Sequence, residues 1–137
     1  MAVVVELIRK ESDGTLSFGN YTLDVKSKVS DFEHKGDLYK VKTFNEITKL
    51  EKNGMFIFES VPGTAVFHMD TTDNKILFQI AGTDTAQITL ELEAEKEYEI
   101  SRDDVFLGKM KTNLGGKLVF SLELSEEEKA FIKVVKL

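Results

Sequence analysis

The chain has 137 residues, the length of one ordinary domain, and is long enough to bury a substantial apolar core. It contains no cysteine, which excludes disulfides and thiolate metal sites, and its 24 acidic and 18 basic residues give a formal net charge of −6. A negative net charge repels nucleic-acid phosphates and anionic lipid, and the basic residues are spread along the sequence in groups no larger than a pair. We therefore expect neither nucleic acid nor a membrane as a partner.

The first residues are apolar and β-branched and predict a terminal β-strand that contains Val3, Val4, Val5 and Leu7. This run has no basic start and is interrupted by Glu6, so it does not have the form of a signal peptide. No apolar run approaches the roughly 20 residues that span a bilayer. Together with the absence of cysteine, these features lead us to expect a cytoplasmic protein.

Turn residues and alternation then divide the first third of the chain. A turn at 11–14 is followed by a second strand that contains Leu16 and Phe18, which indicates a hairpin. Residues 30–37 are predicted as a polar loop, and alternation resumes at Tyr39.

The segment 44–54 has two interpretations. Phe44, Ile47 and Leu50 have the spacing of a short amphipathic helix, whereas Asn53-Gly54 is the strongest two-residue signal for a hairpin turn. We favour the hairpin, and the helix stays open as the alternative.

The second half of the chain alternates more clearly. Strands are predicted at 55–59, 64–69, 75–81 and 85–93, in the segment 96–124, and at 131–137. Six apolar residues of two of these strands are expected to be buried together: Ile88, Leu90, Leu92, Leu118, Phe120 and Leu122. Ser125 and Glu128 have the spacing of a capping box, which suggests one helical turn before the last strand.

These patterns predict an all-β protein, an antiparallel β-sandwich of the immunoglobulin-like or jelly-roll-like kind, with at most one or two short helical turns. Residues 1–137 are expected to form a single domain. Within it, 1–59 would supply N-terminal strands and 60–137 an immunoglobulin-like meander.

The sequence contains no pattern that predicts catalysis, a cofactor site or a metal site. His34 lies in the predicted polar loop and His68 in an alternating strand, and neither stands beside a recognisable nucleophile motif. The run Asp70-Thr71-Thr72-Asp73-Asn74 is rich in turn formers and is interpreted as a hairpin loop, in preference to a set of metal ligands.

Four segments of the chain resemble a family of short bacterial proteins that carry the label endosialidase-like: GTLSFGNYTLD, FNEITKLEKNG, SVPGTAVFH and KTNLGGKL. The likeness extends over nearly the whole chain. Separately, YEISRDDVFLGKMKTNLGGKLVFSLEL is similar to accessory β-sandwich modules of carbohydrate-active enzymes, although Asp104-Val105 replaces the usual Asp-Gly of the turn. The second resemblance implies a carbohydrate-binding or accessory role.

Sialidase activity is not expected from the residues themselves. Sialidases resemble one another in binding the sialic carboxylate with three arginines, whereas this chain has only Arg9 and Arg102. Tryptophan is absent, and the sialidase Asp box is represented only by the shortened Ser12-Asp13-Gly14-Thr15.

We therefore expect a non-catalytic protein that acts through surface contact, as a structural, self-associating or docking module with a homo-oligomer or protein partner. Val3, Val4, Val5 and Leu7 are the candidate self-association residues, because an apolar terminal strand offers an unprotected edge. The alternative is a glycan-binding module, whose candidate ligand-contact aromatics are Tyr21, Tyr39 and Tyr98.

Overall fold

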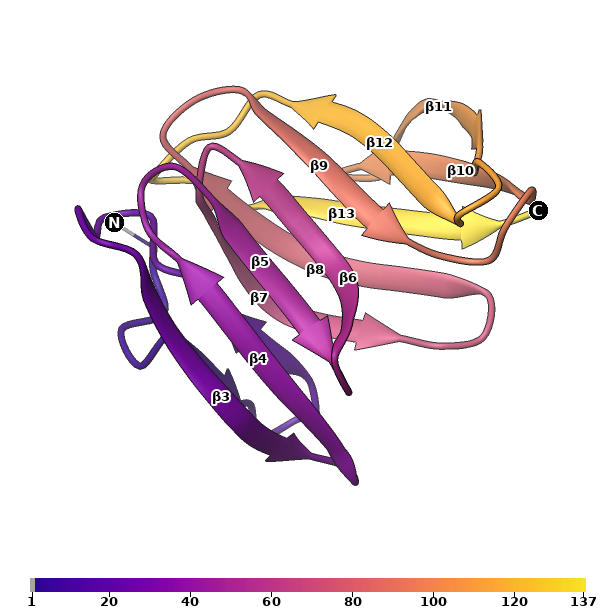
Figure 1. Ribbon diagram of the computed structural model, residues 1–137. Helices are drawn as coiled ribbons and strands as arrows, with labels where there is room; N and C mark the ends of the chain where they lie inside the picture. Colours follow the sequence, from indigo (N-terminus) through magenta and orange to yellow (C-terminus); the bar gives the residue numbers. More distant parts are fainter. Residues whose placement is uncertain (1) are drawn as a thin grey trace.

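The computed structural model describes residues 2–137 and has 13 strands within them, which form two antiparallel sheets packed face to face (Figure 1). This architecture confirms the predicted all-β sandwich. No helix occurs among residues 2–137, and accordingly none that is long and apolar enough to cross a bilayer. The strands are β1 (Ile8–Lys10), β2 (Leu16–Phe18), β3 (Ser27–His34), β4 (Asp37–Thr43), β5 (Thr48–Lys52), β6 (Met55–Val61), β7 (Thr64–Thr71), β8 (Lys75–Gly82), β9 (Ala86–Glu91), β10 (Glu97–Arg102), β11 (Val105–Lys111), β12 (Lys117–Leu122) and β13 (Ala130–Lys136).

The seven-stranded sheet has the order β1-β2-β7-β8-β13-β10-β11, and the six-stranded sheet has the order β12-β9-β6-β5-β4-β3. Each sheet takes strands from both 1–59 and 60–137, and the boundary expected between these parts falls inside β6. The C-terminal strand β13 lies inside the seven-stranded sheet, between β8 and β10. It therefore presents no free edge.

The core is formed by the inward-facing residues of both sheets. Leu118 and Phe120 of β12 lie opposite Leu90 and Ile88 of β9, and all four are buried as predicted. Leu122 is buried as well, whereas Leu92 is only partly buried because it follows the end of β9.

Three phenylalanines join the two sheets at the centre of this core. The ring of Phe58, from the six-stranded sheet, packs edge-on against Phe18 at 5.3 Å and Phe78 at 6.0 Å, both from the seven-stranded sheet. All three side chains are completely buried. Edge-to-face pairs of this kind add about 0.5–1.5 kcal/mol each beyond the area they bury.

The structure decides the interpretation of 44–54. Strands β5 and β6 form a hairpin in which Lys52 pairs with Met55, and Asn53 and Gly54 both have positive φ, as a type I′ turn requires. The predicted hairpin is confirmed, and the helical alternative is wrong.

The predicted polar loop at 30–37 is wrong. Strand β3 runs through this segment, and only Lys35-Gly36 forms the turn to β4. The alternation is interrupted because the register of β3 against β4 shifts between Val29 and Phe32, with Asp31 at a φ of 56°. Such a β-bulge in an edge strand with a polar outer face resembles a loop in the sequence.

The N-terminal residues also differ from the expectation, because Val3, Val4 and Val5 form no strand and β1 is confined to Ile8–Lys10. Val4 packs on the outer face of the seven-stranded sheet, where it is completely buried with Ala65, Phe67 and Ala81. Its backbone N–H donates to the carbonyl oxygen of Gly19 at 3.0 Å. The N-terminal segment therefore packs onto the face of the sheet and does not extend it as an edge strand.

The helical turn expected at 125–128 is absent from the structure. The hydroxyl of Ser125 does accept hydrogen bonds from the backbone N–H groups of Glu127 and Glu128, at 3.1 and 3.4 Å. The segment nevertheless contains only bends, and it connects β12 to β13 as an exposed acidic loop.

Candidate functional site

The three tyrosines suggested as glycan contacts have different environments. Tyr21 and Tyr98 are 3% and 4% exposed, and the hydroxyl of Tyr98 accepts a hydrogen bond from the backbone N–H of Glu93 at 3.2 Å. Burial raises the pKa of Tyr21. A sugar stacks on the open face of a ring, which neither residue offers. Tyr39 is half-buried and lines a cavity between the sheets.

The proposed self-association residues are not assembled on an edge. Val4 is buried, Val3 and Leu7 are partly buried, and only Val5 is largely exposed, at 77%. A single exposed valine is ordinary for a protein surface and provides no row of unpaired backbone groups. The structure therefore gives no support to an interface at these four residues.

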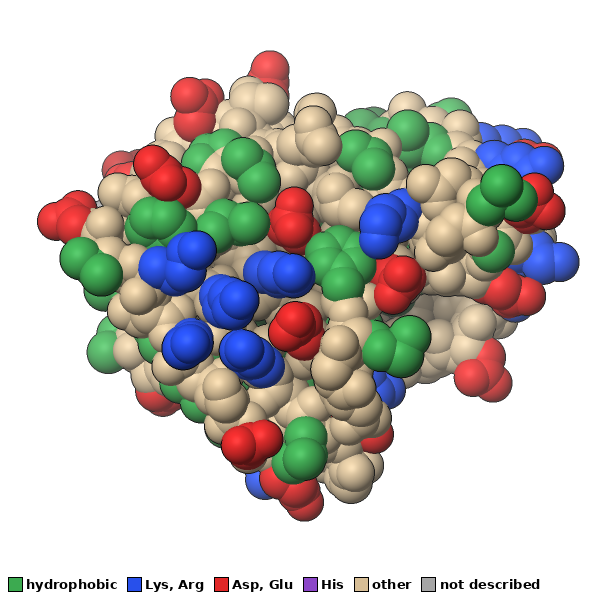
Figure 2. All heavy atoms as spheres, viewed as in Figure 1, with side chains coloured by type: hydrophobic (Ala, Val, Ile, Leu, Met, Phe, Trp, Pro, Cys, Tyr) green, Lys and Arg blue, Asp and Glu red, His purple; other side chains and the backbone are tan. Residues whose placement is uncertain are grey.

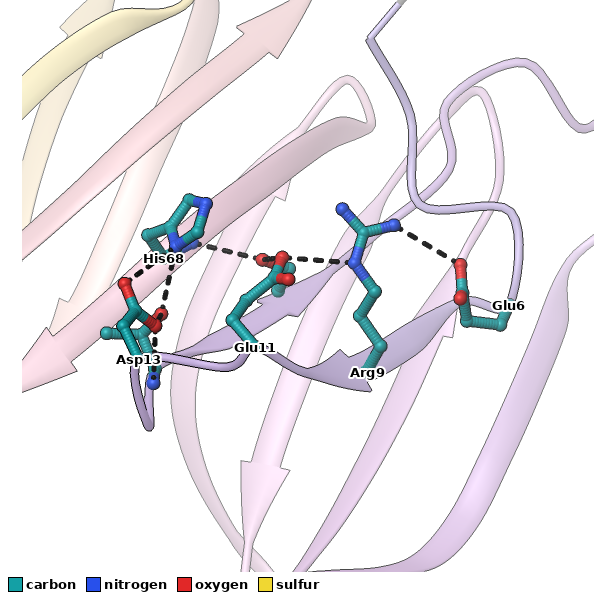
Figure 3. Close-up of polar contacts among 7 residues, drawn as sticks. Glu6, Arg9, Glu11, Asp13 and His68 are labelled. Carbon is teal, nitrogen blue, oxygen red and sulfur yellow. Dashed lines mark hydrogen bonds and ion pairs between the residues drawn. The ribbon is translucent and has the colours of Figure 1, made fainter.

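A polar network lies across β1, β2 and β7 and includes His68 (Figure 3). The ring atom Nδ1 of His68 lies 3.1 Å from Asp13 Oδ2 and 3.1 Å from Thr15 Oγ1. His68 occupies a bulge in β7, with a φ of 54° and a register shift between Phe67 and Asp70. The bulge directs this ring toward the turn that carries Asp13.

Aspartate, histidine and serine occur together in this network, but they are not arranged as a nucleophile with its base. The hydroxyl of Ser17 donates to Glu11 Oε2 at 2.5 Å and accepts from the backbone N–H of His68 at 3.0 Å. A nucleophilic serine needs a hydrogen bond to the imidazole ring itself. Ser17 has no such bond to the ring, and its hydroxyl connects β2 to the backbone of β7.

The remaining members of the network hold Glu11 as a carboxylate. The hydrogen bond from Ser17 lowers the pKa of Glu11, and the nearby Arg9 lowers it further. Arg9 Nε donates to Glu11 Oε2 at 3.0 Å, and its Nη1 atom lies 3.4 Å from Glu6 Oε1. Both arginines of the chain are engaged in this way, since Arg102 donates to the carbonyl oxygen of Glu123 and lies 3.8 Å from Asp103.

The shortened Asp-box segment at 12–15 forms the turn between β1 and β2. Asp13 Oδ1 accepts hydrogen bonds from both the backbone N–H and the hydroxyl of Thr15. These bonds lower the pKa of Asp13. The residues therefore have a local structural role in the turn.

The most distinctive surface feature is a group of lysines on the outer face of the six-stranded sheet (Figure 2). Lys42 of β4 lies directly opposite Lys28 of β3 on one side and Lys49 of β5 on the other. Lys40 follows the same outward direction along β4, and Lys26 lies over the ring of Phe44 at 5.8 Å. We call this group the lysine face: Lys26, Lys28, Lys40, Lys42 and Lys49.

The lysine face forms no close ion pairs within the described chain. Within residues 2–137, none of its five ammonium groups has a carboxylate within 4 Å, whereas Lys10, Lys52, Lys117 and Lys136 all do. Like charges directly opposite each other on adjacent strands destabilise a sheet. Lys40 and Lys49 also lie opposite Glu51 and Glu59 of neighbouring strands, so the unfavourable like-charge pairs are those of Lys42 with Lys28 and with Lys49.

Sequence reasoning missed the lysine face because it counted neighbours along the chain. The lysines occur in separate groups, such as Lys26 with Lys28 and Lys40 with Lys42, and each group obeys the alternation of its strand. Only the register of β3, β4 and β5 places them in one row. The expected dispersal of positive charge is thus wrong in three dimensions.

No cluster of three or more potential metal ligands of the His, Cys, Asp or Glu type occurs in the described part of the chain. The chain matches no family model, no curated protein and no solved structure. The resemblance to endosialidase-like proteins and to accessory modules stays a prediction.

Proposed function

We propose that the protein is a non-catalytic docking module whose lysine face binds an acidic protein surface, and that a second copy of the chain can supply this surface. One observation carries the proposal: five lysines that have no carboxylate within 4 Å in residues 2–137 are gathered on one sheet face of an acidic protein. Surface contact was expected from the sequence, and the lysine face is the feature that supports docking as its form.

Charge complementarity favours a copy of the same chain. Without the five lysines, the formal charge of −6 would be −11, so the remainder of the molecule is strongly acidic. Surfaces of opposite sign attract each other and orient the encounter of two molecules. The lysine face can therefore find its complement on another copy.

The loop between β12 and β13 is the acidic segment best suited to this contact. It contains Glu123, Glu126, Glu127 and Glu128, of which three are exposed and Glu126 is partly buried. None of these four carboxylates has a lysine or arginine partner within 4 Å in the described chain. The loop is therefore free to accept lysines from a neighbour.

A contact between the lysine face and this loop joins two different surfaces. Such a head-to-tail contact leaves one free face and one free loop in every dimer, so it continues into rings or open chains. Its strength depends on ionic strength, because exposed charges are screened within about 10 Å at 0.1 M salt.

The experiment measures molar mass by light scattering coupled to size-exclusion chromatography, at low salt and at high salt. We expect the protein to associate at low salt and to dissociate at high salt. The double variant Lys42→Glu with Lys49→Glu should be monomeric at both. The matched control is Lys109→Glu with Lys111→Glu, which changes the charge equally on β11 and should still associate.

A mixing experiment distinguishes the proposed contact from a general charge effect. The variant Glu127→Lys with Glu128→Lys keeps the lysine face but loses the acidic loop. Mixed with Lys42→Glu with Lys49→Glu, it should form dimers and nothing larger, because only one complementary contact is left. A full-length protein that stays monomeric at low salt and high concentration would reject self-association.

A further inference from the structure

A cavity of about 380 Å³ lies between the two sheets, at the end of the sandwich where the β3–β4, β5–β6 and β7–β8 hairpins turn. The other end of the sandwich is the one where β5 begins and β6 ends. The cavity is separate from the lysine face, since none of the five lysines lines it. Its size is within the usual range of small-molecule sites.

The inner part of the cavity is apolar. Its wall takes side chains from both sheets, with Leu16, Met69 and Ile76 on one side and Ile57 and Leu92 on the other. Leu16, Met69 and Ile76 are buried and belong to the main core. A ligand with an apolar body would replace water along this wall, which is favourable.

Two polar side chains at the wall have no hydrogen-bond partner among residues 2–137. His34 is only 8% exposed, and its ring lies 6.1 Å from the ring of Tyr39. Neither the ring nitrogens of His34 nor the hydroxyl of Tyr39 is among the hydrogen-bonded groups of the described chain, and neither residue is sealed from the cavity. These atoms are therefore available to form hydrogen bonds with a ligand in the cavity.

The mouth of the cavity carries more negative than positive charge. The acidic lining residues are Asp37, Asp70, Asp73 and Glu91, and the basic ones are Lys35 and Lys52. Lys52 is already paired with Asp37 at 3.4 Å, whereas Asp70 and Asp73 have no basic partner within 4 Å in the described chain. The mouth thus disfavours an anionic ligand.

We propose that this cavity binds a small amphiphile with an apolar body and an uncharged or cationic head that forms hydrogen bonds with His34 and Tyr39. The apolar wall determines the body, the two unpartnered side chains determine the polar head, and the acidic mouth determines its charge. This site is independent of docking at the lysine face.

The test uses three eight-carbon probes that differ only in the head: 1-octanol, octylamine and octanoate. Each is titrated into the isotopically labelled full chain, and the amide resonances are followed by NMR. We expect saturable shifts centred on the cavity residues for octanol and octylamine. Octanoate should bind about tenfold more weakly, as one unfavourable charge interaction would require.

Two substitutions test the location of the site. Leu92→Trp replaces an aliphatic side chain by a larger aromatic ring that fills part of the cavity. It should weaken octanol binding at least about tenfold, because the apolar body of octanol loses its contact with the wall. Its matched control is Leu107→Trp on β11, where the leucine is 49% exposed and far from the lining residues, and this variant should bind octanol normally. His34→Ala should weaken octanol binding roughly two- to tenfold, the worth of one hydrogen bond.

Melting curves show whether each of the three variants is folded. If one cavity variant does not fold, the other cavity variant and the NMR shifts of the native chain test the proposal. Shifts that do not saturate, shifts centred on the exposed β11, or tightest binding of octanoate would overturn the proposal. The proposal is equally wrong if every folded cavity variant binds octanol as well as the native chain.

Discussion

On the outer face of the seven-stranded sheet, the buried hydroxyl of Ser17 and the carboxylate of Glu11 connect β2 to its neighbours. Ser17 is completely buried, and its hydroxyl contacts both Glu11 and the backbone of His68. A buried hydroxyl that lost these partners would cost about 1–3 kcal/mol. The network in Figure 3 therefore fixes β2 against the bulge of β7.

Glu11→Gln tests this structural role through pH. Because the folded protein lowers the pKa of Glu11, its carboxylate stabilises the fold above its unfolded pKa, and this contribution is lost as the pH falls through the folded pKa. The variant should unfold about 1 kcal/mol more easily than the native chain at pH 7. The difference should shrink toward zero as the pH falls below about 4, the ordinary range of a glutamate.

Urea unfolding at pH 7 and pH 3 measures both values. Glu33→Gln is the matched control, because Glu33 is exposed and only 3.7 Å from the similarly exposed Lys10. It should change the stability little at either pH. An equal loss of stability at both pH values for Glu11→Gln would show that the charge of Glu11 is irrelevant.

At the scale of elements, the N-terminal segment acts as a cover for the seven-stranded sheet. The side chain of Val4 packs against Phe67, Ala65 and Ala81, on the face of the sheet that points away from the main core. The adjacent Val5 points into solvent. The same residue type thus occupies opposite environments at consecutive positions.

This pair provides a matched test of the cover. Val4→Ala should lower the free energy of unfolding by about 1–2 kcal/mol, because it removes buried methyl groups and leaves a void. Val5→Ala should leave it unchanged within about 0.5 kcal/mol, as for most surface substitutions. Denaturant unfolding of the two variants gives the comparison, and equal effects would contradict the packing of Val4.

Local patterns were sufficient for the elements whose alternation is uninterrupted. Ile88, Leu90, Leu118 and Phe120 could be assigned to the core because strict alternation determines which face is buried. The Asn53-Gly54 turn could be predicted because its positive φ values need such residues.

Other features depend on contacts between distant segments, which local patterns do not contain. The β3 segment was missed because a bulge interrupts its alternation, and Val3-Val4-Val5 suggested a strand although an irregular segment buries Val4 equally well. The lysine face and the cavity both require the register of strands or the packing of two sheets. Each is assembled from side chains that are ordinary in the sequence.

At the scale of the whole molecule, the distribution of charge is the feature that folding alone does not explain. An acidic chain places Lys28, Lys42 and Lys49 in one row across three strands, although its many carboxylates offer numerous other arrangements. Natural proteins lie only just above the stability that they need, and sites that bind a partner often reduce stability. The row should therefore be replaceable with a gain in stability.

Lys42→Glu tests this inference at the centre of the row. The new carboxylate would lie between Lys28 and Lys49, so two repulsive cross-strand pairs become attractive. We expect stability to rise by about 0.5–1 kcal/mol at low salt, and by less at high salt, where the charges are screened. Lys111→Glu makes the same charge change on β11 but places the carboxylate opposite Glu97, so it should destabilise the fold. Opposite signs for the two variants, with association lost only in Lys42→Glu, would separate the role of the lysines in docking from any role in folding. A loss of stability in Lys42→Glu would instead show that the lysine row supports the sheet, and unfavourable charge would then be no reason to infer docking.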